Sequence, residues 1–153
     1  LQVVLTFIAF LFILPGLLTS NPTSVRSEAV LDRTDAVQGM LRITRHPFLW
    51  GISIWAAGHL VVNGDLASFV LFGTMLVLGL LGPISIDAKR RRALGDQWTA
   101  FAARTSNIPF AAILTGRQAF RPVEIGWRIL PAIIVWGAIA HFHALLFGVR
   151  ALP

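Results

Sequence analysis

Four histidines lie in or beside long apolar stretches, where an ionisable side chain is a candidate for function. His46 and His59 are thirteen residues apart. On one helix about 20 Å of axial rise would separate them, so they cannot bind the same ion. His59 lies near the far end of its apolar run. It is either a ligand or a neutral imidazole hydrogen-bonded to a carbonyl of a neighbouring helix.

His141 and His143 lie in the last apolar run, and their spacing directs them to opposite faces of a helix. His143 and His59 lie at similar distances from the outer ends of their helices, so the two side chains could meet at one level. Imidazoles from two helices on either side of a flat cofactor are how helical bundles hold haem. The alternative is that one histidine of this pair faces the bundle and the other faces lipid.

A group of charged residues lies where the apolar runs end. Asp87 follows the third run, and Arg45, His46 and Arg104 could surround it. Such a cluster can bind the charged end of a cofactor. Alternatively, Asp87 is a solvated charge that balances the basic run at residues 89–92.

The composition indicates a membrane protein. Of 153 residues, 56% are hydrophobic and 13% are charged, whereas a soluble domain has about 25% charged residues. The net charge of +6 does not indicate nucleic-acid binding, because a soluble basic protein would lack such long uncharged runs. The absence of cysteine excludes disulfides and thiolate metal sites. Leu1 lies inside an apolar run, which predicts that the N-terminus is incomplete.

We predict an all-α fold, a polytopic transmembrane helical bundle that forms a single membrane domain over residues 1–153. Four spans are expected, at about residues 1–18, 47–63, 66–86 and 127–149. Pro47 suits the first turn of the second span, and Asp65 can cap the third. Pro83 should kink the third span near its end.

Two polar connections join these spans, at residues 19–46 and 87–126. We expect a short surface helix over residues 24–41. The spacing of Leu94, Trp98 and Phe101 predicts an interfacial helix in the membrane plane. Twelve of the thirteen basic residues lie in or beside these connections, and only Arg150 lies on the other side. Both connections should therefore be cytoplasmic.

Several motifs follow one another in a distinctive order: Arg42-Ile-Thr-Arg-His-Pro-Phe-Leu-Trp-Gly51, His59, the turn Asn63-Gly-Asp65 and the stretch Arg104–Leu114, which Gly116-Arg-Gln118 follows. This order resembles the NnrU family and its relative, the plant and cyanobacterial zeta-carotene isomerase. It runs from about Pro22 to Gln118, and the ending from His143 to Gly148 also looks like the family. It implies a bacterial inner-membrane protein. NnrU proteins are associated with denitrification, whereas the isomerase is a membrane haem b protein that isomerises a cis double bond.

The resemblance also implies a ligand. Trp55-Ala-Ala-Gly-His59 matches the isomerase segment whose histidine binds haem iron, so His59 inherits that role. Ala56 stands where the isomerase has a cysteine. The isomerase's other haem histidine corresponds to a position upstream of Leu1. The second ligand is therefore absent, upstream, or supplied by His143 or His141.

A more distant resemblance is to the isoprenylcysteine carboxyl methyltransferases, through Arg45-His-Pro-x-x-x-Gly51 and the pattern from Leu94 to Thr105. It implies binding of S-adenosylmethionine by Arg45, His46, Asp87 and Arg104. This chain has Ile86-Asp87 in place of that family's paired glutamates.

Three hypotheses follow. The first is a haem b protein, with His59 and His143 as iron ligands, that isomerises an apolar polyene or supports nitrite and nitric oxide reduction. The second is a small membrane methyltransferase. The third is a non-catalytic subunit of a larger membrane complex. We leave open whether the chain is an enzyme, although the resemblance favours a haem-dependent isomerase.

Overall fold

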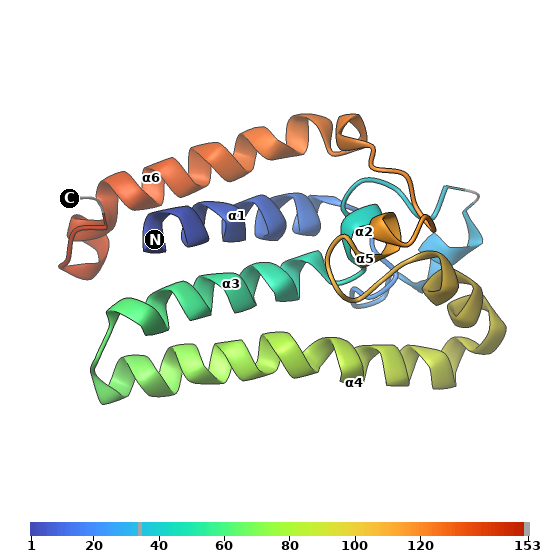
Figure 1. Cartoon of the computed structure of the whole chain (residues 1–153), viewed down its shortest axis with the longest axis horizontal. Helices are drawn as coiled ribbons and strands as arrows, with labels where there is room; N and C mark the ends of the chain where they lie inside the picture. Colours follow the sequence, from blue (N-terminus) through green and yellow to red (C-terminus); the bar gives the residue numbers. More distant parts are fainter. Residues whose placement is uncertain (34, 152–153) are drawn as a thin grey trace.

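Four long helices make up most of the chain and lie side by side (Figure 1). They are α1 (Gln2–Leu18), α3 (Pro47–Val62), α4 (Leu66–Arg104) and α6 (Ile129–Phe147). The computed structural model describes residues 1–33 and 35–151, and these contain helices and loops but no strand. The predicted all-α fold is confirmed for this part of the chain.

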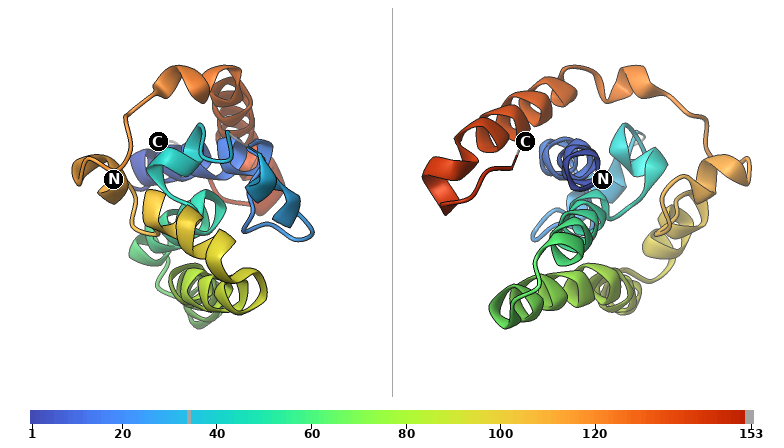
Figure 2. Two further views of the ribbon diagram at one scale, coloured as in Figure 1. Left: turned by 90° about the vertical axis from the view of Figure 1, so that its right-hand side faces the viewer. Right: turned by 60° about the vertical axis from the view of Figure 1, so that its left-hand side comes forward.

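The helices are arranged in the order α6, α1, α3, α4. Helix α1 packs against both α6 and α3, and α3 packs in turn against α4. The right panel of Figure 2 shows α6 and α4 at the two ends of a curved array, with α1 and α3 between them. The start of α1, the α3–α4 turn and the end of α6 lie together at one end, and the polar connections lie at the other (Figure 1).

The hairpin between α3 and α4 forms as predicted. Helix α3 begins at Pro47, directly after His46. Asp65 caps α4, because its carboxylate accepts a hydrogen bond from the backbone N–H of Ser68 at 2.9 Å. The connection is so short that α3 and α4 must be antiparallel neighbours.

Helix α4 is longer than predicted, and the connection 87–126 is correspondingly shorter. The helix continues past Ile86 and through Pro83 to Arg104, because the alanine- and arginine-rich stretch after Asp87 favours helix. Its break lies at Gly95, where φ is +52°, a conformation that glycine adopts without steric cost.

The apolar stripe that predicts an interfacial helix is covered by the chain itself, and the position of this helix in the membrane plane stays a prediction. The break at Gly95 turns Trp98 and Phe101 toward Val37 and Leu41, and all four side chains are buried in one cluster. The apolar stripe therefore binds a neighbouring segment of this chain instead of a membrane surface. Apolar spacing on a helix is the same for both partners, so the spacing could not decide between them.

The predicted helix over residues 24–41 is wrong. This segment contains a 3₁₀ turn, η1 (Glu28–Asp32), and residues 35–39 before α2 (Met40–Ile43) are not helical. Gly39 has a φ of +56° and directs the chain into α2. Met40 and Ile43 enter a second buried cluster with Phe12 and Ile125. Tertiary packing on two sides therefore determines the path of this segment.

The chain between α4 and α6 passes through three short helices, α5 (Ala111–Leu114), η2 (Pro122–Glu124) and η3 (Gly126–Arg128).

In the part of the chain that the structure describes, two helices have the length and composition to cross a membrane, fewer than the four predicted spans. They are α4 and the helix at Gly126–Phe147, and only 17% and 6% of their apolar stretches are buried. Such exposure distinguishes them from core helices of a soluble protein. Helices α1 and α3 are apolar but shorter, with 17 and 16 residues. The fold therefore favours a membrane protein.

Glycines allow the central helices to approach closely. A Cβ atom added at Gly51 of α3 would lie 2.8 Å from the carbonyl oxygen of Ala9 in α1. A Cβ atom at Gly79 of α4 would lie 2.9 Å from the carbonyl oxygen of Leu49 in α3. In contrast, Gly137 of α6 faces open space. The contacts α1–α3 and α3–α4 therefore depend on small residues, as is common between membrane helices.

We expect the substitution Gly51→Ala to destabilise the protein by about 1–3 kcal/mol, because the added methyl group would separate α1 from α3. The matched control Gly137→Ala should be neutral or stabilising by up to about 1 kcal/mol, since alanine favours helix. Unfolding in detergent, followed by circular dichroism as SDS is added, measures both. A Gly51→Ala protein as stable as the control protein would contradict close packing at this position.

Candidate functional site

A cavity of about 760 Å³ opens among α1, α3, α4 and α6, at the end of the bundle where the α3–α4 turn lies. Its size is within the range of roughly 300–1,000 Å³ that is usual for cofactor and small-molecule sites. Most of its wall is apolar, and all four long helices contribute side chains. They include Val3, Phe10, Ile13, Ile52, Leu71, Phe72, Trp136, Ile139 and Phe147.

His59 lies in the last turn of α3 and lines this cavity. Its Nδ1 atom is 2.8 Å from the carbonyl oxygen of Trp55. Because a carbonyl oxygen only accepts hydrogen bonds, Nδ1 carries a proton, and in the neutral imidazole Nε2 then keeps its lone pair. The ring stacks on Phe72 at a centroid distance of 4.7 Å, and the Trp55 ring lies 4.5 Å away. The imidazole is therefore fixed in both tautomer and orientation.

His143 lines the same cavity from α6. Its Nδ1 atom is 2.8 Å from the carbonyl oxygen of Val149, and by the same reasoning its Nε2 atom keeps a lone pair. The two histidines that we proposed as iron ligands thus line one cavity. His141 lies two residues earlier on α6 and is exposed, with its ring against Phe142. His141 is not among the residues that line the cavity.

The donor set suits some metal sites and not others. Within residues 1–33 and 35–151, no group of three or more His, Cys, Asp or Glu side chains could hold a metal ion. These residues therefore do not bring together enough side chains to chelate a metal ion. Haem needs only axial ligands from the protein, and an imidazole whose other nitrogen donates to a carbonyl is the usual form of a histidine ligand.

The second predicted cluster forms at the opposite end of α3. Both nitrogens Nε and Nη2 of Arg45 lie 2.8 Å from Oδ2 of Asp87. The Nε2 atom of His46 lies 2.7 Å from Oδ1 of the same carboxylate. His46 is 2% exposed. One carboxylate thus has three charge-assisted contacts with two side chains, and the start of α3 is bound to the middle of α4.

Further hydrogen bonds close this cluster. Nη1 of Arg45 donates to Oγ1 of Thr105 at 3.2 Å, and its backbone N–H donates to the carbonyl of Ser106 at 2.9 Å. The carbonyl oxygen of Arg45 accepts from Nδ2 of Asn21 at 3.0 Å. The polar groups of Arg45 are thus bonded to neighbouring segments of the chain. This arrangement suits positioning of helices better than binding of a ligand.

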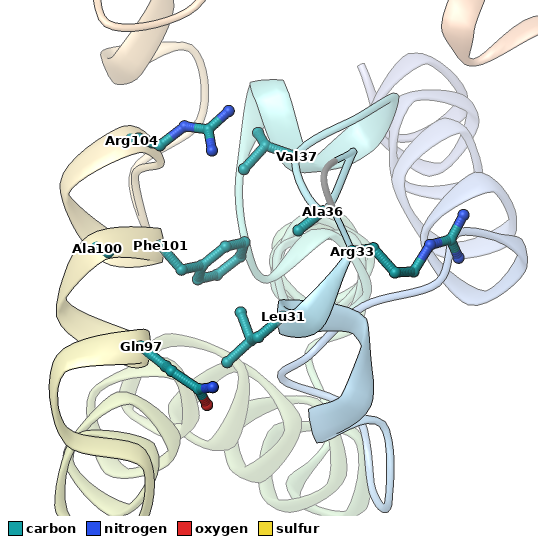
Figure 3. Close-up of a pocket in the computed structure, with 8 residues that line it drawn as sticks. All are labelled: Leu31, Arg33, Ala36, Val37, Gln97, Ala100, Phe101 and Arg104. Atoms are coloured by element: carbon teal, nitrogen blue, oxygen red, sulfur yellow. The ribbon is translucent and has the colours of Figure 1, made fainter.

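Arg104 lies elsewhere. Its side chain lines a separate hollow of about 230 Å³ between α4 and residues 31–37. Figure 3 shows Phe101 and Leu31 pointing into this hollow from its two sides, while the guanidinium of Arg33 points away. The expectation that Arg104 joins the group around Asp87 therefore needs correction. Its position is taken by Thr105 because α4 ends at Arg104 and the chain then turns.

A third polar cluster, which was not predicted from the sequence, lies at Glu124. Nε and Nη2 of Arg42 donate to the two carboxylate oxygens of Glu124 at 2.7 and 3.0 Å. The backbone N–H of Gly39 donates to the same carboxylate at 2.9 Å, and Nη1 of Arg42 donates to Gln118 at 2.5 Å. Glu124 is the only acidic residue after Asp96, among several arginines. A single carboxylate among several arginines could have predicted a structural ion pair here.

We expect Asp87→Asn to destabilise the protein by about 3–5 kcal/mol, the usual cost of removing one partner from a buried ion pair. The side chains of Arg45 and Asp87 are only 13% and 15% exposed. The matched control Asp35→Asn removes a carboxylate from an exposed pair with Arg33, so it should change stability by no more than about 0.5 kcal/mol. Equal effects of the two substitutions on SDS unfolding would contradict the assigned role of Asp87.

The hydrogen bonds from Arg42 hold the pKa of the Glu124 carboxyl below its ordinary value, near 4.5. A lowered pKa in the folded state means that this contribution to stability is complete above pH 4.5 and is lost as the pH falls through the lowered pKa. We expect Glu124→Gln to reduce the thermal midpoint at neutral pH and to flatten its decrease in acid. Midpoints from circular dichroism between about pH 3 and pH 7 test this. A variant whose acid profile has the slope of the wild type would contradict it.

This chain is similar to known proteins over most of its length. Residues 1–151 match the family model described as NnrU protein. The chain is 29% identical to 15-cis-zeta-carotene isomerase, chloroplastic, from Arabidopsis thaliana, over 90% of this chain and 39% of that protein. It is 29% identical to the protein of the same name from Zea mays, over 74% of this chain and 30% of that protein. This chain thus spans less than half the length of these relatives. No solved structure matches. Because the family model covers almost the whole length, the chain belongs to the NnrU family.

Proposed function

We propose that this chain is a haem-binding membrane protein that isomerises a double bond of an apolar polyene. The observation that carries the proposal is the pair His59 and His143. They line one apolar cavity, and each has its Nδ1–H donated to a carbonyl and its Nε2 lone pair available. The names of the two relatives, which are 15-cis-zeta-carotene isomerases, supply the reaction class.

All four long helices cross the membrane in this proposal. Helices α1 and α3 have about the minimum length for a span, which is roughly 17 residues, and they lie beside α4 and α6. The basic residues gather in the connections 19–46 and 87–126, which supports a cytoplasmic position of these connections at a bacterial inner membrane. The cavity then lies in the outer half of the bilayer, where an apolar molecule can reach it from the lipid.

The residues of the cavity fit haem b. The imidazoles of His59 and His143 would hold the iron from two different helices, and the aromatic rings of Trp55, Phe72 and Trp136 provide apolar walls. When bound, haem would supply a Lewis-acidic, redox-active iron. The carbonyls of Trp55 and Val149 would hold the two imidazoles in one tautomer. The stacked Phe72 ring would prevent His59 from turning away.

The same walls suit a polyene. Isomerisation of a cis double bond adds and removes no atoms and needs no water, so a site that excludes water and holds hydrocarbon suits the substrate. Rotation about the double bond would still need the chemistry that haem supplies. The side chains of α1, α3 and α6 supply that environment. The cluster of Arg45, His46 and Asp87 has the role of a structural anchor in this proposal, because its polar atoms bond within the chain. That closure argues against S-adenosylmethionine at this position.

We expect the protein purified from membranes to carry haem with a Soret band, and His59→Ala to lower its haem affinity by at least about 10–100-fold. This is the loss usual for removing even an outer partner of a metal ligand. His143→Ala should have a similar effect. The matched control His141→Ala changes an exposed histidine on the same helix and should keep its haem. Full haem content in His59→Ala would overturn the assignment.

A second measurement tests the reaction. Chromatography of a 15-cis polyene after incubation with the haem-loaded protein should show loss of the cis isomer, and His59→Ala should abolish that loss. Haem-loaded protein that leaves the polyene unchanged would reject the isomerase and favour a role in nitrite or nitric oxide reduction at the same haem.

A further inference from the structure

Apart from Thr6 and the two histidines, the polar side chains of the cavity gather at one end of it. Gln2 lies at the start of α1, Asn63 and Ser68 lie at the α3–α4 turn, and Arg150 follows α6. These positions are all at the end of the bundle where the helix termini meet (Figure 1). The cavity therefore has an apolar body and a polar mouth. Among the residues that line it, Arg150 alone carries a fixed charge.

The turn after α6 positions Arg150. Gly148 has a φ of +76°, which ends the helix and reverses the chain. Its N–H donates to the carbonyl of Ala144 at 3.0 Å. The next carbonyl, of Val149, accepts the hydrogen bond from His143. The same short turn that fixes the imidazole of His143 thus brings the following residue, Arg150, to the mouth of the cavity.

The charge of Arg150 is unusual for its place. Every other basic residue lies at the opposite end of the bundle or in the connections there, so Arg150 departs from the charge bias that sets membrane orientation. Among the residues that the structure describes, Arg150 makes no salt bridge with a carboxylate. A cation at the edge of an apolar cavity provides a partner for an anionic group of a ligand.

We propose that Arg150 binds a carboxylate of the cavity's ligand, so that this ligand is an amphipathic porphyrin whose acidic edge lies at the mouth. The inference rests on the proposed function and adds a recognition element to it. Arginine presents a planar pair of N–H donors that matches a carboxylate. The apolar macrocycle lies among the aromatic walls near His59 and His143, and its carboxylates reach Gln2, Asn63 and Arg150 at the polar end.

Metal-free protoporphyrin IX and its dimethyl ester test this without iron. Both have the same macrocycle, but only the first has carboxylates. Trp55 and Trp136 line the cavity, so quenching of tryptophan fluorescence reports binding in detergent. We expect Arg150→Gln to weaken binding of the diacid about tenfold, as for loss of one charge-assisted contact, and to leave binding of the ester unchanged. The matched control Arg91→Gln, on the exposed surface of α4 at the other end, should change neither.

Each result supports or overturns the inference. Equal affinities of Arg150→Gln and wild type for the diacid would overturn it, as would equal weakening for diacid and ester or no binding of either porphyrin to the wild type. These outcomes are distinct from failure of the proposed function. Selective weakening for the diacid, together with full haem content in His59→Ala, would support Arg150 and reject His59 as a ligand. Haem binding that depends on His59 but not on Arg150 would support His59 as a ligand and reject the role of Arg150.

Discussion

The rest of this structure depends on the contacts of one carboxylate, that of Asp87, with two neighbouring side chains. This carboxylate binds Arg45 and His46 at the start of α3 and so fixes the position of α3 along α4. At the other end of the same two helices, that position brings His59 of α3 against Phe72 of α4. The buried ion pair and the candidate ligand are thus the two ends of one helix hairpin. Displacement of one along the helix axis would displace the other.

The remaining helices complete the cavity by contacts of a different kind. Helix α1 packs closely on α3 at Gly51, and Trp136 of α6 packs edge-to-face on Phe7 of α1 at 5.0 Å. Nε1 of Trp136 also donates to Thr6 at 3.2 Å. In a bilayer such packing and hydrogen bonds hold helices together, because lipid is as apolar as the helix surfaces. Because these contacts need no charged side chain, the walls of the cavity can be apolar, and the charged clusters lie near the ends of the helices.

Several features followed from the residues themselves. Proline at position 47 and aspartate at position 65 predict the two ends of the α3–α4 hairpin, because each acts on the backbone within one helical turn. The grouping of Arg45, His46 and Asp87 was also predictable, since all three lie where apolar runs end. The Glu124 contacts were missed, because their partners Gly39 and Arg42 lie more than eighty residues earlier in the chain.

Local chemistry in the sequence determined that the chain is helical, where the hairpin turns, and at which end the charges gather. Tertiary structure decided where the apolar stripe of Trp98 and Phe101 packs, which way Arg104 points, and that His59 and His143 line one cavity. The reason is that helical spacing fixes the face on which a residue lies but not the neighbour that covers that face. The neighbour depends on the order of α6, α1, α3 and α4 across the array, and that order arises only when distant segments pack.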